Sequence, residues 1–209
     1  SVEVFLFNVK NALSPDCSTN RTRLVALAED KKTDGRLVFH EIRQGFDFPE
    51  LSASDIIIDG LFGTGLSRPL DGGFASLVKA LNAAGNAVVA IDMPSGLMSE
   101  ENSYNDNSRI IRATLTLAIH RPKPSHLMPE NEPFVGELVI LPIGLSEERE
   151  AQIASHLNIS ERTQMAAFLH RRPRYAHKGT MGHALLMAGS KGMAGAAIMA
   201  AKACLRGGV

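Results

Sequence analysis

Two short apolar stretches each lead into an aspartate. Residues 56–58 are all isoleucine and precede Asp59, and residues 88–91 precede Asp92. Runs of this kind are typical of strands buried in a parallel sheet. Ligands of open α/β sheets bind in the crevice outside the carboxyl ends of the strands. If the two strands are neighbours, both carboxylates reach one crevice. The plainer alternative is that each aspartate only forms a turn or caps a helix.

A glycine-rich loop follows the first aspartate. Gly63 and Gly65 flank Thr64, and without side chains at two positions a phosphate could approach the backbone N–H groups closely. A strand-to-helix turn also favours glycine for its own geometry. The loop alone therefore leaves both readings open.

The elements around these residues alternate between strand and helix patterns. A helix start is expected at Ser14-Pro15-Asp16. Strands are expected at 2–8, 36–42, 55–59, 87–91, 114–119 and 137–141, and helices at 21–30, 72–84 and 147–157. This alternation predicts an α/β fold, a Rossmann-like three-layer sandwich with a mostly parallel sheet and helices on both faces.

A second segment begins after residue 157. Residues 158–175 are typical of a linker, and a strand at 182–188, a glycine-rich turn at 189–195 and a helix at 196–205 form the first β-loop-α unit of another α/β domain. We therefore predict domains at 1–157 and 158–209. The charge divides similarly, because residues 1–158 carry 14 Lys and Arg against 21 Asp and Glu, whereas residues 159–209 carry eight against one.

Composition excludes several classes of protein. The 209 residues hold 22 basic and 22 acidic side chains and are 44% hydrophobic, which is too apolar and too balanced for a disordered chain. No apolar run is long enough for a membrane span. The two cysteines, Cys17 and Cys204, make no disulfide framework and favour a reducing compartment. We expect a cytoplasmic protein.

Other residues offer weaker candidates. The seven histidines lack zinc-ligand spacing. The basic run 171–174 has one following aromatic residue and no repeated basic-aromatic pattern, so we expect no nucleic-acid partner. Lys123 could reach a phosphate, but a surface position is favoured. We expect a small-molecule substrate, no membrane partner and a homo-oligomeric state.

The two aspartate segments resemble a known family. DGLFGTGLSRP at 59–69 and AIDMPSGL at 90–97 are similar to the YjeF N-terminal domain, the NAD(P)H-hydrate epimerase family. YAHKGTMGH at 175–183 and AGSKGMAGAA at 188–197 resemble the opening of the ADP-dependent NAD(P)H-hydrate dehydratase domain, which has a ribokinase-like fold. The order of the two matches the bifunctional NAD(P)H-hydrate repair enzymes of bacteria.

The resemblance implies roles for individual residues. Asp59 and Ser95 would be potassium ligands, and their oxygens suit a hard cation. Asp92 would contact the hydrated nicotinamide and act as the acid/base group, and Ala196, beside Gly195, would contact the substrate of the second domain. The remaining substrate-contacting residues would be Gly63, Thr64, Gly65, Leu66, Ser67, Arg68 and Pro69.

The implied reaction interconverts the R and S forms of NAD(P)H hydrated at C6 of the nicotinamide ring. A dehydratase then removes water from the S form with ADP or ATP. Residue types do not decide between water loss with readdition and ring opening. The expected cofactors are K⁺ and, for the dehydratase half, ADP or ATP.

The chain also departs from the family pattern. A loop rich in Asn, Gly and Asp, which contributes an Asn to the potassium site, is missing, and so is the Gly-Thr-Gly-Asp stretch with the catalytic Asp of the dehydratase. We therefore expect a fragment with little activity of its own. The alternatives are a non-catalytic YjeF-type scaffold module and, from the fold of the tail alone, a sugar or pyrimidine kinase.

Overall fold

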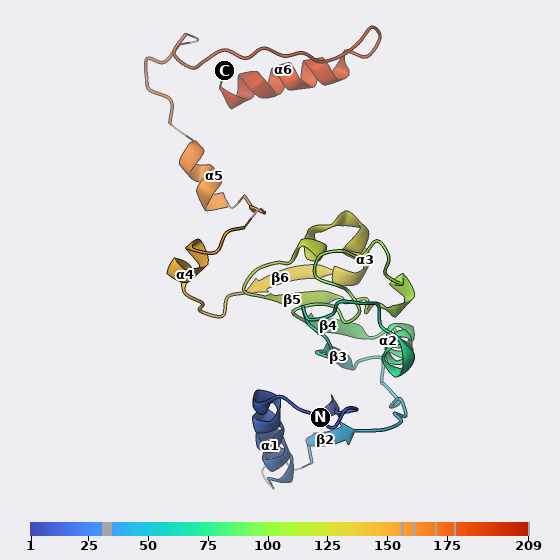
Figure 1. Cartoon of the computed structure of the whole chain (residues 1–209). Helices are drawn as coiled ribbons and strands as arrows, with labels where there is room; N and C mark the ends of the chain where they lie inside the picture. Colours follow the sequence, from blue (N-terminus) through green and yellow to red (C-terminus); the bar gives the residue numbers. More distant parts are fainter. Residues whose placement is uncertain (31–34, 156, 161, 170, 178, 209) are drawn as a thin grey trace. The chain divides into compact units, whose positions relative to one another are not determined.

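The computed structural model describes residues 1–30, 35–155, 157–160, 162–169, 171–177 and 179–208 (Figure 1). These residues form two compact units, Ser1–Glu150 and Ala151–Val209. The domain boundary predicted after residue 157 stays a prediction. The two units are described separately.

The first unit alternates strands and helices along the chain. Ser14 caps the first helix, because its side chain accepts a hydrogen bond from the Cys17 N–H, and Pro15 occupies the first turn. The elements are β1 (Val2–Phe7), α1 (Pro15–Glu29), β2 (Leu37–Ile42), β3 (Ile56–Asp59), α2 (Gly72–Ala84), β4 (Ala87–Ile91), η2 (Asn107–Arg109), β5 (Leu115–Ile119), η3 (Pro124–Leu127), η4 (Pro129–Asn131), α3 (Glu132–Val135), β6 (Glu137–Leu141) and α4 (Glu147–Ala151).

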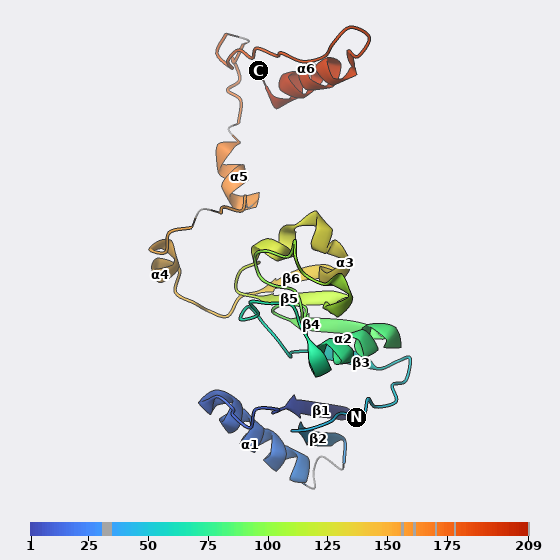
Figure 2. The ribbon, with the colours of Figure 1, turned by 45° about the vertical axis from the view of Figure 1, so that its right-hand side comes forward.

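All strand pairs in this unit are parallel. β1 pairs with β2, and a four-stranded sheet has the order β3-β4-β5-β6 (Figures 1 and 2). The predicted α/β class is confirmed. Asp59 lies opposite Ala90 in the β3–β4 register. Asp59 and Asp92 therefore lie at the same edge of the sheet, where parallel strands place ligand-binding groups.

Two apolar clusters hold this edge in place. Helix α2 contributes Ala75 and Val78 to the first cluster, where they join Val88 and Ala90 of β4. The second cluster lies beyond the strand ends and contains Met93, Leu97, Ile110, Phe134 and Val135. Met93 and Leu97 are fully buried. The segment that carries Ser95 is therefore anchored on both sides by buried side chains.

Strand β3 differs from the expectation of a strand buried on both faces. Ile57 packs against the α2 cluster, but Ile56 and Ile58 are 65% and 62% exposed. Successive side chains of a strand point to opposite faces. β3 is the edge strand of its sheet, and the described residues leave its second face uncovered.

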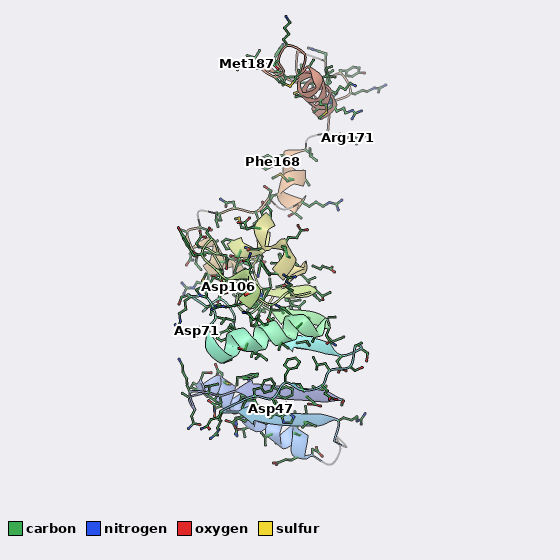
Figure 3. All side chains as sticks on the ribbon, turned by 90° about the vertical axis from the view of Figure 1, so that its right-hand side faces the viewer. Asp47, Asp71, Asp106, Phe168, Arg171 and Met187 are labelled. Carbon is green, nitrogen blue, oxygen red and sulfur yellow. The ribbon has the colours of Figure 1, made fainter. Side chains whose placement is uncertain are left out.

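The second unit departs further from the sequence-based expectation. It contains α5 (Arg162–Phe168), inside the predicted linker, and α6 (Gly195–Gly207). The predicted strand at 182–188 is wrong, because a strand needs a hydrogen-bonded neighbour and no described residue pairs with this segment. Met187, labelled in Figure 3, is 90% exposed.

The helix expected at 147–157 is also shorter than predicted. It ends at Ala151, and the side chains of Ile153 and Leu157 are 72% and 67% exposed. A short helix without a buried apolar face gains little from tertiary packing. Within the described part of the chain, no helix has the length and apolar character needed to cross a membrane.

We predict that Gly96→Ala is severely destabilising. Gly96 has φ of +98°, and an added Cβ would overlap the Arg109 carbonyl oxygen and lie 2.9 Å from the Ile110 Cα. We expect a loss of about 3 kcal/mol or more in the free energy of urea unfolding. Gly73→Ala is the matched control, because no atom lies within 4 Å of its Cβ position. Equal stabilities of the two variants would contradict the prediction.

Candidate functional site

A buried hydrogen-bonded pair joins β3 to the turn after β4. The Ser95 hydroxyl donates to Asp59 Oδ1 over 2.6 Å, and the Ser95 backbone N–H donates to Asp59 Oδ2 over 2.7 Å. Asp59 is 2% exposed and Ser95 is fully buried. Buried polar groups of this kind are stable only when they are paired.

The same pair reaches into the loop after β3. The Leu61 N–H donates to Asp59 Oδ1 over 3.3 Å, and the Phe62 N–H donates to the Ser95 hydroxyl over 3.0 Å. Burial raises the pKa of Asp59, and the hydrogen bonds from Ser95 and Leu61 oppose this effect. The side chains of Asp59 and Ser95 therefore order the start of the glycine-rich loop.

The oxygens of this pair have the chemistry that a hard cation requires. A carboxylate offers about four lone-pair positions and a hydroxyl oxygen two. Asp59 accepts three hydrogen bonds and Ser95 Oγ accepts one, so each side chain retains a lone pair. Oxygen ligands of this kind suit hard cations.

Asp92 lies just beyond the end of β4 in a left-handed backbone conformation. Its φ is +68°, a value that is uncommon for non-glycine residues but that aspartate adopts more readily than most. The Asp92 backbone N–H donates to the Leu117 carbonyl over 2.9 Å, and the Ile119 N–H donates to Asp92 Oδ1 over 3.2 Å. Two bonds to β5 thus hold Asp92 in this conformation.

Asp92 faces the glycine-rich loop. A Cβ placed on Gly63 would lie 3.5 Å from Asp92 Oδ2. In the loop, Thr64, Gly65, Ser67 and Arg68 are exposed, whereas Leu66 packs against the α2 cluster. Gly63 and Pro69 are half-buried. The structure therefore brings Asp59, Ser95, Asp92 and this loop to one edge, while the assigned roles stay predictions.

Lys123 is the site residue that the sequence-based reasoning misplaced. The expected surface position is wrong, because the Lys123 ammonium forms an ion pair with Asp92 Oδ1 and the side chain is only 19% exposed. The signal available in the sequence was its place four residues after the strand expected at 114–119, which the structure shows to be a neighbour of β4.

His126 was not singled out from the sequence. Its Nδ1 accepts a hydrogen bond from the Lys123 backbone N–H over 3.2 Å, which places the ring proton on Nε2. His126 is 7% exposed, and its Nε2 has no hydrogen-bond partner among the described residues. Burial and the Lys123 ammonium lower the pKa of His126, and the Asp92 carboxylate opposes this.

The residue predicted to contact the substrate of the second domain is Ala196, which belongs to the second unit. Ala196 is exposed in the first turn of α6. Lys178, from the segment that resembles the dehydratase opening, lies outside the described residues.

An apolar cavity of about 450 Å³ is also present in the first unit. It is lined by several aromatic side chains, among them Phe7, Phe46 and Phe74. None of the predicted site residues lines it. We place the site at the Asp92 edge, because charged groups that could move a proton are gathered there and not in the cavity.

We predict that His126 makes stability fall on acidification. Its pKa in the folded state lies below the reference value of 6.5, so the unfolded chain binds the proton first as the pH drops. The contribution of neutral His126 is complete above pH 6.5 and is lost as the pH falls toward the folded-state pKa. Urea unfolding between about pH 7 and pH 5 should show a smaller loss for His126→Asn. Identical pH dependence in both proteins would contradict the assignment.

The chain is similar to a known protein family and to several curated proteins. The family model described as YjeF-related protein N-terminus matches residues 1–125. The bifunctional NAD(P)H-hydrate repair enzyme Nnr of Coxiella burnetii is 34% identical over 78% of this chain and 33% of its own length. The enzyme of the same name from Vibrio cholerae is 33% identical over 75% of this chain and 31% of its own length.

The likeness extends beyond residue 125. The Nnr enzyme of Thermofilum pendens is 33% identical over 99% of this chain and 37% of its own length. The chain thus spans about a third of the length of these relatives. Because the family model covers more than half of the sequence, the chain belongs to the family of YjeF-related protein N-terminal domains.

Proposed function

We propose that this chain carries the epimerase site of a NAD(P)H-hydrate repair enzyme. One observation supports this above the others: Asp92 is fixed through Oδ1, while its Oδ2 faces the glycine-rich loop. The names of the relatives, bifunctional NAD(P)H-hydrate repair enzymes, support the substrate class. The enzyme would interconvert the R and S hydrates of NADH or NADPH.

Asp92 would be the group that moves the proton. Both routes open to this reaction, water loss with readdition and ring opening, require a proton to reach or leave the oxygen on C6. Asp92 Oδ2 would make that transfer, and its position opposite Gly63 without a hydrogen bond from the described residues supports this. A general acid or base must lie within hydrogen-bond reach of the proton it moves. The largely exposed loop from Thr64 to Arg68 would hold the substrate through its backbone N–H groups.

Asp59 and Ser95 would hold a potassium ion beside this loop. When bound, the ion would supply positive charge that offsets the negative phosphates of the substrate. The two lone pairs left on the Asp59 carboxylate and the Ser95 hydroxyl support this assignment.

The region after residue 157 would belong to the ADP-dependent dehydratase. The match to the Thermofilum pendens enzyme over 99% of the chain supports this part of the proposal. Ala196 would contact the hydrate that the dehydratase returns to NAD(P)H, with ADP or ATP as the second ligand. The expected cytoplasmic location and homo-oligomeric state stay predictions.

The epimerase activity is tested on the protein at its full natural length. One separated epimer of hydrated NADPH is supplied in KCl, and the other epimer is measured by chromatography against a protein-free control. Asp92→Ala should slow the conversion at least about 100-fold. Asp47→Ala, a change at an exposed aspartate in the same unit, should leave the rate unchanged. Binding of the hydrate by the wild type without conversion would instead support a scaffold module.

The potassium site is tested by thermal melting. A ligand that binds only the folded state raises its stability, so the wild type should melt at a higher temperature in KCl than in tetramethylammonium chloride of equal ionic strength. Ser95→Ala should lose this difference, because it removes one of the two oxygens. A potassium response that survives in Ser95→Ala would contradict the assignment of Ser95.

A further inference from the structure

The Lys123 ammonium contacts other protein groups, and its side chain is largely buried. Its ammonium donates to Asp92 Oδ1 and to the Ile119 carbonyl, the latter over 3.1 Å. The side chains of Lys123 and Asp92 are 19% and 17% exposed. At this degree of burial, removal of one partner leaves the other charge poorly solvated.

The two oxygens of Asp92 have different surroundings. Oδ1 receives the Lys123 ammonium and the Ile119 N–H. Oδ2 receives no hydrogen bond from the described residues. It faces Gly63, because a Cβ added to that glycine would lie 3.5 Å from Oδ2. The carboxylate therefore presents one defined oxygen to the loop.

Lys123 is itself held by a well-anchored turn. Its backbone N–H donates to His126 Nδ1. Ser125, at the centre of η3, is fully buried, its N–H donates to the Ser99 carbonyl over 3.1 Å, and its own carbonyl accepts from Asn131 Nδ2 over 2.9 Å. These bonds fix the backbone from which the Lys123 side chain reaches Asp92.

We propose that Lys123 is the positioning residue of Asp92. Together with the Ile119 N–H, the Lys123 ammonium holds Oδ1, limits rotation of the carboxylate and leaves Oδ2 available to the substrate proton. Lys123 acts through Asp92 and need not touch the substrate. This inference rests on the proposed epimerase function, because it assigns the proton transfer to Asp92.

The size of the effect follows from geometry. A displacement of about 1 Å at the reacting atoms costs about 100-fold in rate. Without the ammonium, Oδ1 keeps only the hydrogen bond from the Ile119 N–H, so the carboxylate is held less firmly. We expect Lys123→Met to lower kcat about 100-fold with a smaller change in KM.

The test is a double-mutant cycle on the epimerase rate of the protein at its full natural length. Lys123→Met is measured in the wild type and in the Asp92→Asn variant. If Lys123 acts through Asp92, its loss should change the rate of Asp92→Asn by no more than about twofold. Lys123→Arg should recover part of the rate, because arginine retains the charge–carboxylate contact. Lys79→Met, at an exposed lysine of α2, is the control.

The possible results separate the proposed epimerase function from the role of Lys123. No conversion by the wild type contradicts the proposed function itself. With an active wild type, an unchanged kcat in Lys123→Met overturns the role of Lys123. Equal fold losses from Lys123→Met in both backgrounds also overturn it, because they show an effect independent of Asp92. Thermal melting of every variant identifies a loss of rate that only reflects unfolding.

Discussion

The hydrogen bonds between Asp59 and Ser95 tie the end of β3 to the turn after β4. Both residues are almost completely buried. Each is satisfied by the other and by the N–H groups of Leu61 and Phe62. A polar group left unpaired at this depth costs about 1–3 kcal/mol. The start of the loop is therefore determined by a side-chain pair that is 36 residues apart in sequence.

The position of Asp92 depends on the same edge. Asp92 leaves β4 in a left-handed conformation and is tied to β5 through Leu117 and Ile119. Ser95, three residues later, is tied to β3. The segment from Asp92 to Ser95 is thus hydrogen-bonded to both β3 and β5. The Asp92 carboxylate therefore faces the loop whose start Ser95 orders. Lys123 adds a third connection from the segment after β5.

The sequence predicted this edge well because its signals are local. Apolar runs that end in Asp59 and Asp92 indicate strands, and parallel strands place their carboxyl ends together. Lys123 and His126 were harder to predict, since a lone lysine or histidine in a loop has no pattern, and its burial depends on the packing of η3. The strand expected at 182–188 failed for a similar reason: a strand depends on its partner, which residue pattern alone does not supply.

Amide hydrogen exchange at Phe62, measured by NMR, tests most directly whether the Asp59–Ser95 pair holds the site. The Phe62 N–H donates to the Ser95 hydroxyl, so Ser95→Ala removes its acceptor. Loss of a hydrogen bond worth about 1–1.5 kcal/mol should speed this exchange about tenfold, while exchange at Val78 in α2 stays unchanged. Equal exchange at Phe62 in the wild type and in Ser95→Ala would contradict the account.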